Sequence, residues 1–406
     1  MVKTIKIIRI AAFTFVLFSL ALLIYSFYAI PDEIYAPDGN TSISGMFYSI
    51  SPVSENVTGE QRDGQKTINV KVELFNAIPV KNSLLRIEKR RYVVPSGKIF
   101  GLRLYTKGVI IVSTDKVDTA EGSRYPANEA GLEKGDIILF IDSYEITDHT
   151  QVSALIAQSG GRALKIVFER ENVRYETNFI PALSGAQNKY MGGLWIRDSA
   201  AGIGTMTFYE KSNGSFGGLG HPICDTDTGK SLEISSGDIV GAVINSCRKG
   251  KSGEAGELCG SFTGDAIGTL EENCAVGVYG KLNETDSDAA QLPVAVKSEV
   301  RQGKAEIIST IDAGGPCYYA IEIEQISPND RENRNMIIRI TDKRLLEKTG
   351  GIVQGMSGSP IIQNGMLVGA VTHVFVNEPE RGYAVFAETM LNESENVTFS
   401  MQQLAS

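Results

Sequence analysis

The sequence predicts a mainly β protein of several domains, preceded by one apolar helix at its N-terminus. Three observations predict this fold class. The 406 residues exceed one ordinary domain, for which about 100–200 residues are usual. The 42 glycines and 13 prolines suit short strands and tight turns better than long helices. From residue 67 onwards, apolar and polar residues alternate along many short runs, which is typical of half-buried strands.

Composition narrows the possible functions. Hydrophobic residues make up 42% and charged residues 21% of the chain, which indicates a globular protein rather than a disordered one. The formal net charge of −9 argues against a nucleic-acid partner. Five cysteines are too few for a disulfide scaffold. Cys247 and Cys259 flank a Gly-rich loop and could pair, but two buried thiols fit the pattern equally well. No metal ion or cofactor is expected.

The N-terminal residues predict a membrane anchor. Lys3, Lys6 and Arg9 give residues 1–9 a positive charge, and residues 10–30 carry no charge at all. A helix needs roughly 20 apolar residues to span a bilayer, and a basic flank stays in the cytoplasm. We therefore expect an uncleaved transmembrane signal-anchor over 10–30, with the rest of the chain extracytoplasmic. The alternative is a cleaved signal peptide, whose apolar region is usually about 7–15 residues long.

Residues 31–94 are predicted to form a linker, rich in Ser, Gly, Asp and Asn up to residue 66, followed by strands. A distinct module covers 95–183. It contains PANEAGLEKGDIILFID and one amphipathic helix after Asp148, which is a good N-cap. The first of these segments resembles the core of PDZ domains.

The PDZ resemblance implies an α+β module that binds a peptide or protein ligand by adding a strand to a sheet edge. Gly101 and Leu102 would begin the strand that receives the ligand. Val152 and Ile156 of the helix would form the opposite wall. The alternative is a PDZ-like spacer without a ligand.

Residues 186–406 are Gly-rich and β-patterned, and predict a barrel or a pair of barrels. Here Gly355-Met-Ser-Gly-Ser-Pro360 precedes a buried strand. It resembles the G-x-S-G-G-P turn of chymotrypsin-like serine proteases, with Ser359 in place of the second glycine. Such a turn exposes the Ser357 hydroxyl as a nucleophile and lets the N–H groups of Gly355 and Ser357 form an oxyanion hole.

A nucleophilic serine needs a base and an acid that orients the base. Only three histidines exist, and His221 in a Gly-rich segment is the best candidate base. His149 belongs to the PDZ-like module, and His373 reads as a strand histidine near the serine. The acid is left open by linear order alone. The candidate acids are Asp225, Asp227, Asp238, Asp265 and Asp342.

The segments GHPICDTDTG and TDKRLLEKTGGIVQGMSGSPIIQNGMLVGAVTHVFVN, together with the anchor and the PDZ-like module, closely resemble the stage IV sporulation protein B peptidases of endospore-forming bacteria. The resemblance implies a chymotrypsin-like β-barrel domain with a triad of Ser357, His221 and Asp342. It also places Thr372 near the active site.

The resemblance implies a function as well. The protein would be a serine endopeptidase on the forespore membrane that faces the space between forespore and mother cell. It would cleave a membrane-bound regulatory protein and so activate the processing of a late sigma factor. Two alternatives are a non-catalytic PDZ adaptor and an HtrA-like envelope quality-control protease.

Overall fold

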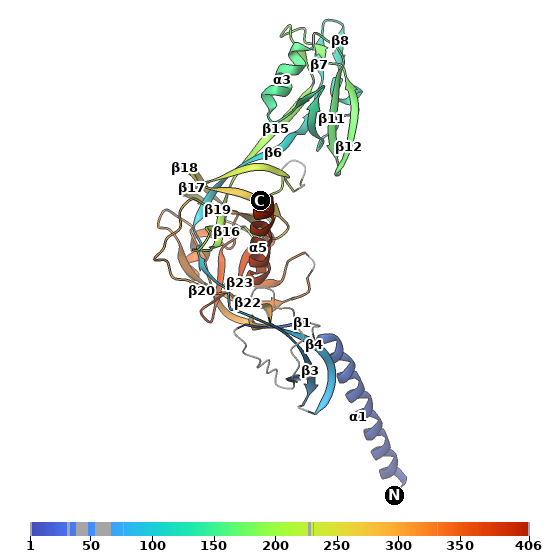
Figure 1. The fold of residues 1–406 in the computed structure, drawn as a ribbon, viewed down its shortest axis with the longest axis vertical. Coiled ribbons are helices and arrows are strands. Elements are labelled where there is room, and N and C mark those ends of the chain that lie inside the picture. Colours follow the sequence, from blue (N-terminus) through green and yellow to red (C-terminus); the bar gives the residue numbers. More distant parts are fainter. Residues whose placement is uncertain are drawn as a thin grey trace. The chain divides into compact units, whose positions relative to one another are not determined.

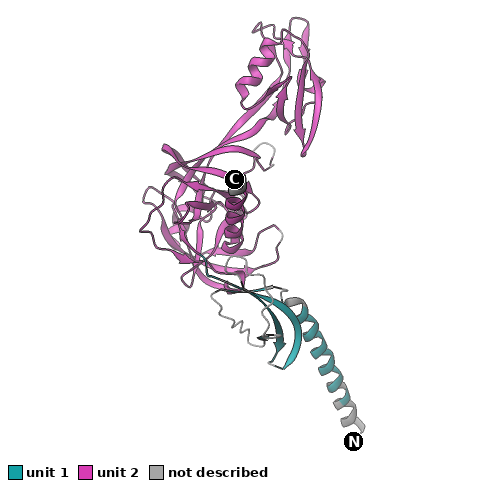
Figure 2. Ribbon diagram, in the orientation of Figure 1, with its two compact units in different colours: residues 1–91 teal, residues 92–406 magenta. Residues whose placement is uncertain are grey.

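The computed structural model of the protein describes residues 2–30, 33–37, 48–52, 66–75, 77–225, 229, 231–330 and 332–404. The chain divides into two compact units, Met1–Arg91 and Tyr92–Ser406 (Figure 2).

The first unit is one helix and a small sheet. Its elements are α1 (Val2–Ala29), β1 (Glu33–Pro37), β2 (Tyr48–Pro52), β3 (Lys66–Leu74) and β4 (Ile78–Glu88). The strands lie in the order β1-β4-β3-β2. Val70, Val72 and Leu85 alternate with polar residues and are buried in its core. The predicted linker up to residue 66 therefore contains two strands of this sheet.

The N-terminal helix α1 forms where an apolar helix is predicted. However, within the described ranges no helix combines the length and the hydropathy that crossing a membrane requires. The structure therefore does not support the predicted transmembrane segment over residues 10–30.

The second unit contains two barrels, and the mainly β prediction is confirmed (Figure 1). The first barrel runs β6-β17-β18-β19-β16-β15 and is closed by pairing of β15 with β6. Its strands and their neighbours are β5 (Tyr92–Pro95), β6 (Ile99–Thr114), β15 (Leu194–Tyr209), β16 (Ser215–Gly218), β17 (Ile234–Arg248), β18 (Glu257–Cys274), β19 (Gly277–Leu282) and β20 (Leu292–Pro293). Phe100, Leu104, Phe216 and Val278 fill its core.

The second barrel is closed in the order β21-β22-β23-β26-β25-β24. Its strands are β21 (Gly303–Ser309), β22 (Cys317–Ile326), β23 (Met336–Ile340), β24 (Pro360–Gln363), β25 (Met366–Phe375) and β26 (Glu378–Phe386). The short η1 (Lys297–Glu299) precedes them, α4 (Lys343–Thr349) follows β23, and α5 (Ala387–Leu404) ends the chain.

The PDZ-like module is inserted into the first barrel. Its elements are β7 (Val117–Thr119), β8 (Gly122–Arg124), α2 (Pro126–Glu129), β9 (Ile137–Ile141), β10 (Tyr144–Glu145), α3 (His149–Gln158), β11 (Leu164–Arg170) and β12 (Val173–Phe179), followed by β13 (Ala182–Leu183) and β14 (Tyr190–Met191). As predicted, Asp148 caps α3 by accepting from the N–H groups of Thr150 and Gln151. The long strands β6 and β15 are paired with each other along most of their length, and this pairing extends from the barrel into the module (Figure 1). The barrel region therefore begins well before the predicted boundary at residue 186.

The predicted peptide groove of this module is not formed by the residues we assigned to it. Gly101 pairs with Ile203 and Val240 inside the barrel, and a Cβ on Gly101 would lie 2.5 Å from the Phe262 ring. Leu102 is only 3% exposed and belongs to the barrel core. Val152 and Ile156 are core residues of the module. The reason is that β6 begins in the barrel core with Leu102 and Leu104, and only its later residues, such as Val109 and Ile111, pack in the core of the module.

Leu102→Asp should therefore destabilise the first barrel instead of weakening the binding of a ligand to the PDZ-like module. A buried carboxylate without a partner costs several kcal/mol, so we expect a clearly lower melting temperature. Cleavage of long and short substrates should fall together. A stable variant that lost only ligand binding to the PDZ module would contradict this placement.

The five cysteines are free, including Cys247 and Cys259. Both lie on the paired strands β17 and β18, but Cys247 is opposite Leu258 and Cys259 is opposite Ser246. Since directly opposite residues share a face of the sheet, the two thiols belong to different faces. The possible hairpin disulfide is therefore not formed.

Candidate active site

The serine turn lies between the two barrels and is held by β15. Gly355 and Gly358 have φ values of +99° and +94°, which favour glycine. A Cβ on Gly358 would lie 2.0 Å from the Thr205 carbonyl oxygen. The Thr205 N–H donates to the Ser357 carbonyl at 3.0 Å, and its hydroxyl donates to the Gly355 carbonyl at 2.7 Å. Thr207 donates to the Gly358 carbonyl at 2.8 Å. The turn is thus fixed by strand β15 of the first barrel.

Two backbone donors of this turn have no acceptor. Within the part of the chain that the structure describes, neither the Gly355 N–H nor the Ser357 N–H donates a hydrogen bond. Buried or half-buried N–H groups are normally paired. Two unoccupied donors flanking a serine hydroxyl are what an oxyanion hole requires.

His221 follows β16 after Leu219 and Gly220, which have φ values of 64° and 73°. Its Nδ1 lies 2.8 Å from the Pro222 carbonyl oxygen. Because a carbonyl oxygen only accepts, Nδ1 carries the proton and the Nε2 lone pair is left to accept one. Burial lowers the pKa of His221 below its usual value, so the imidazole is neutral near pH 7. This is the protonation state that a general base needs.

Ser357 and His221 line one cavity of about 740 Å³, but their side chains are not hydrogen-bonded to each other. The Ser357 hydroxyl donates instead to the Thr372 carbonyl at 2.6 Å. Catalytic hydrogen bonds are often unmade until substrate arrives. The rest of the lining is mostly apolar and includes Leu102, Leu104, Ala201, Ile203, Leu219, Ile352, Val353, Val374 and Val376.

Thr372 and His373 pack directly against this pair. Thr372 is 3% exposed, and among the described residues its hydroxyl has no hydrogen-bond partner. The His373 ring lies 4.6 Å from the His221 ring. Burial, together with the neighbouring His221 and Arg334, lowers the pKa of His373 to about 4. Thr372 therefore lies beside the serine, and the supporting role that the family resemblance implies for it stays a prediction.

Asp342 does not lie with these residues. Its carboxylate is the N-cap of α4, accepting from the N–H groups of Arg344 and Leu345, and it forms an ion pair with the Arg344 guanidinium at 2.8 Å. This guanidinium is the main cause that lowers the pKa of Asp342 to about 2. Asp342 neither lines the cavity nor bonds to His221. In this structure the Pro222 carbonyl takes the place beside Nδ1 that the predicted triad gives to Asp342.

We expect Asp342→Asn to keep most of the activity, because asparagine caps a helix about as well as aspartate. The kcat/KM should stay within about tenfold of wild type, whereas loss of an orienting triad acid costs about 10⁴ in kcat. Kinetics and thermal melting of the variant check this. A 10⁴-fold loss at an unchanged melting temperature would return Asp342 to the triad.

Among the other candidate acids that the structure describes, Asp225 is the one that lines the cavity. It is buried, and its carboxylate forms an ion pair with Arg197 at 3.0 Å. Asp227 lies outside the described residues.

The threonines of β15 that hold the serine turn were not predicted, because nothing in the strand pattern distinguishes Thr205 and Thr207 from ordinary barrel residues.

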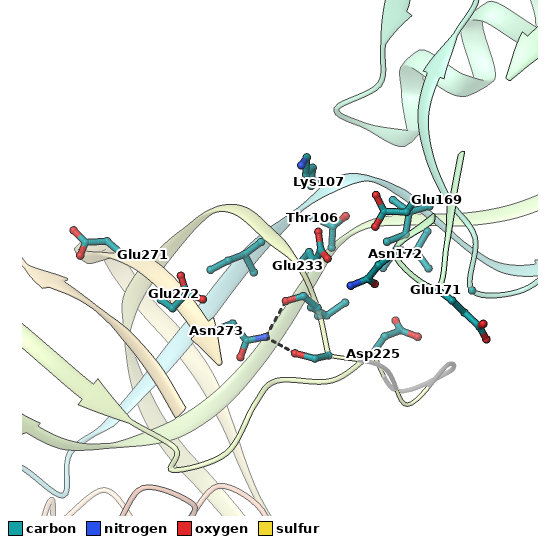
Figure 3. A pocket seen from close by; sticks show the side chains of 16 residues that line it. Thr106, Lys107, Glu169, Glu171, Asn172, Asp225, Glu233, Glu271, Glu272 and Asn273 are labelled. Carbon is teal, nitrogen blue, oxygen red and sulfur yellow. Dashed lines mark hydrogen bonds between the residues drawn. The ribbon is translucent and has the colours of Figure 1, made fainter. Parts of the chain in front are cut away.

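A second, larger cavity of about 810 Å³ does not contain Ser357 (Figure 3). Five glutamates make it acidic, namely Glu169, Glu171, Glu233, Glu271 and Glu272. Burial raises the pKa of both Glu271 and Glu272. Among the described residues, no group of three His, Cys, Asp or Glu side chains is arranged to hold a metal ion.

Comparison with known proteins supports a peptidase. Residues 188–391 match the family described as SpoIVB peptidase S55, and residues 117–170 match a PDZ domain. The first match covers the serine turn, His221 and Thr372.

More distant similarities are weak. D-amino acid dehydrogenases of Vibrio cholerae serotype O1, from strains O395 and M66-2, are 28% identical over 119 residues. That stretch is 29% of this chain and spans a quarter of the dehydrogenases' length. A solved structure described as "HtrA-type protease AlgW with decapeptide" aligns at 11% identity and a TM-score of 0.31, over 75% of this chain and 65% of that one.

Since the SpoIVB peptidase S55 match extends over just over half of the sequence, the chain belongs to this family, and residues 117–170 add a PDZ domain.

Proposed function

We propose that the protein is a signalling endopeptidase that cleaves a membrane-associated regulatory protein during sporulation and thereby triggers processing of a late sigma factor. Family membership supports this role. The observation that carries the chemistry is the cavity in which Ser357, two unoccupied backbone donors and a neutral His221 lie together.

In the proposed reaction, the Ser357 hydroxyl turns from the Thr372 carbonyl to His221 Nε2. Its oxygen attacks the scissile carbonyl while His221 takes the proton. The N–H groups of Gly355 and Ser357 stabilise the oxyanion. His221 then gives the proton to the leaving amine. Water takes the place of the amine, His221 accepts a proton from it as its oxygen attacks the acyl carbonyl, and the proton passes to the Ser357 oxygen as the ester bond breaks.

We also propose that the catalytic domain acts outside the cytoplasm and close to the forespore membrane, and that the PDZ domain binds a peptide or protein partner. The basic residues Lys3, Lys6 and Arg9 before the uncharged stretch 10–30 support a location at a membrane. The PDZ match supports a peptide ligand.

The test is to express the full chain together with candidate membrane-bound regulators of sigma-factor processing. We expect one defined cut in one regulator, absent with Ser357→Ala, and extracytoplasmic accessibility of the catalytic domain in intact sporulating cells. A regulator that is bound but never cut would favour the adaptor alternative. Indiscriminate digestion of unfolded proteins would favour quality control.

A further inference from the structure

The orientation of His221 depends on one peptide group, the one that joins Pro222 to Ile223. The Pro222 carbonyl accepts from His221 Nδ1 at 2.8 Å. The Ile223 N–H, which belongs to the same peptide group, donates to the side-chain oxygen of Asn273 at 2.8 Å. A peptide group is planar and stiff, so a bond that fixes its N–H also fixes the direction of its C=O. Asn273 is therefore linked to the imidazole of His221 through a single rigid unit.

The side chain of Asn273 uses both its oxygen and its nitrogen on this segment. Its nitrogen donates to the carbonyl oxygen of Ile223 at 3.0 Å and to that of Leu232 at 2.9 Å (Figure 3). A side-chain amide offers two N–H donors and one carbonyl acceptor. Asn273 thus holds both polar groups of the Ile223 backbone, as a neighbouring strand would. An ionised aspartate could not do this, because it only accepts hydrogen bonds.

The hairpin of β18 and β19 brings Asn273 to this segment. Asn273 lies near the end of β18 and pairs with Val278 of β19, which in turn pairs with Gly218 at the end of β16. His221 follows β16 after three residues. At the start of β19, a Cβ on Gly277 would lie 2.5 Å from the Gly218 carbonyl oxygen. The hairpin therefore packs closely against the chain before His221, while Asn273 binds the chain after it.

The far end of the same segment has its own anchor. The Asp225 side chain is 1% exposed and forms an ion pair with Arg197 of β15 at 3.0 Å. The Asp225 carbonyl accepts from the Gly229 N–H at 2.8 Å. Of the two anchors, Asn273 is the one bonded to the peptide group that faces the imidazole. Asn273 is therefore the residue that can set the direction of the Pro222 carbonyl.

This direction matters for the chemistry of the base. A neutral imidazole free in water carries its proton mainly on Nε2, the nitrogen that has to accept the serine proton. A bond from Nδ1–H to a fixed carbonyl selects the other tautomer and leaves Nε2 as the acceptor. Hydrogen bonds in a chain polarise one another, so the bond from Ile223 to Asn273 makes the Pro222 carbonyl a stronger acceptor. In a Ser-His-Asp triad, the acid performs this task.

We propose that Asn273 is a positioning residue of the active site, which orients His221 and selects its Nδ1–H tautomer through the peptide group between Pro222 and Ile223. The inference rests on the proposed peptidase function and names the residue that holds the base while Asp342 caps α4. Asn273 does not line the cavity that contains Ser357. Its removal should therefore slow the chemical step and leave substrate binding unchanged.

The first test detects the tautomer by NMR and needs no activity. The full chain contains three histidines, so labelling them with ¹⁵N gives few ring signals, and those absent from His221→Ala belong to His221. We expect the proton on Nδ1 of His221 in the wild type at neutral pH, and a mixture of tautomers or the Nε2–H form in Asn273→Ala. An Nε2–H wild type, or an unchanged Nδ1–H form in a folded Asn273→Ala protein, would overturn the proposal.

The second test measures kcat and KM on a peptide that the wild-type full chain cleaves, taken from a proteome-derived library. Asn273→Ala should lower kcat by about ten- to hundredfold, which is part of the roughly 10²–10⁴ that a positioned base contributes. KM should stay close to the wild-type value, because Asn273 makes no contact in the cavity. A normal kcat in the folded variant, or a higher KM at unchanged kcat, would refute the positioning role.

Asn283→Ala is the matched control for this variant. The Asn283 amide also donates to a carbonyl of β18, that of Ala266 at 3.0 Å, but at the other end of the hairpin. Its removal should leave both kcat and the tautomer of His221 as in the wild type. An equal loss of kcat in Asn283→Ala would mean that the hairpin as a whole is responsible, and would overturn the specific role of Asn273.

Asn273→Asp distinguishes hydrogen bonding from the filling of space. Aspartate has the shape of asparagine but cannot donate to the carbonyls of Ile223 and Leu232. We expect a loss of kcat at least as large as that of Asn273→Ala, with thermal melting to show that the chain is folded. A folded Asn273→Asp protein with wild-type kcat would contradict the proposal. If Asn273→Ala fails to fold, Asn273→Asp and the wild-type tautomer decide.

Labelling of the wild type with a serine-reactive fluorophosphonate separates the failure of this inference from that of the proposed function. A wild type that is not labelled at Ser357 and cleaves no library peptide would contradict the peptidase function, and the tautomer of His221 could still be measured. Normal labelling and cleavage without any effect of the Asn273 substitutions would contradict the positioning role alone.

Discussion

Ser357→Ala should lower kcat for peptide cleavage by a factor on the order of 10⁴–10⁶, because only the oxyanion hole and substrate binding then remain. The variant should fold normally, since the Ser357 side chain makes one hydrogen bond, to the Thr372 carbonyl. Fluorophosphonate labelling should disappear completely. The measurement is kcat on a cleaved peptide, with thermal melting of both proteins.

Ser359→Ala provides a matched control within the same turn. The Ser359 side chain is fully buried and donates to the Ser309 hydroxyl at 3.0 Å, away from the cavity. Its removal leaves a buried hydroxyl unpaired, which costs about 1–3 kcal/mol of stability. We expect a lower melting temperature with labelling retained. Near-normal cleavage by Ser357→Ala, or loss of labelling in a folded Ser359→Ala, would contradict the assignment of the nucleophile.

Local signals in the sequence were sufficient for the parts of the fold that depend on local physics. The glycines around Ser357 occupy positive φ values, as a tight turn requires. Asp148 caps the helix that follows it. The period-two pattern of NMIIRI forms β23 with Met336, Ile338 and Ile340 buried. In each case, the residues that determine the structure are neighbours along the chain.

The errors concern pairings between distant segments. Residues Ile99–Thr114 read equally well as two short PDZ strands or as one long strand. The pairing with β15 and β17, whose paired residues lie 80 or more positions further along the chain, selects the long strand. The same limit applies to Asp342: its position before the serine turn is compatible with a triad, but the helix that follows uses its carboxylate as a cap.

His221→Ala should reduce activity about as much as Ser357→Ala, because removing either residue disables the transfer of the serine proton. The losses in rate from substitutions within one catalytic unit are therefore not additive. His373→Ala is the matched control, with the second imidazole of the same cavity removed. His373 makes no hydrogen bond to Ser357, whose hydroxyl bonds to Thr372 instead. We expect a modest loss from His373→Ala. Equal losses from the two variants would show that the histidines work as a pair.

The pH profile gives an independent test of His221 as the base. Activity requires the neutral imidazole, and burial lowers its pKa below the usual value of about 6.5. Protonation, and with it the loss of activity, should therefore set in only as the pH falls below about 6.5. A protein unfolded by acid would also lose activity, so circular dichroism must show a folded chain across the transition.

Because the ring of His373 lies 4.6 Å from the ring of His221, its imidazolium would repel a charged His221. The pKa of His373 is about 4, so it stays neutral through this range and leaves a single titration. An apparent pKa at or above 6.5 for kcat/KM would mean that His221 gains an acidic partner when the enzyme is active, and would point back to an aspartate that moves to Nδ1.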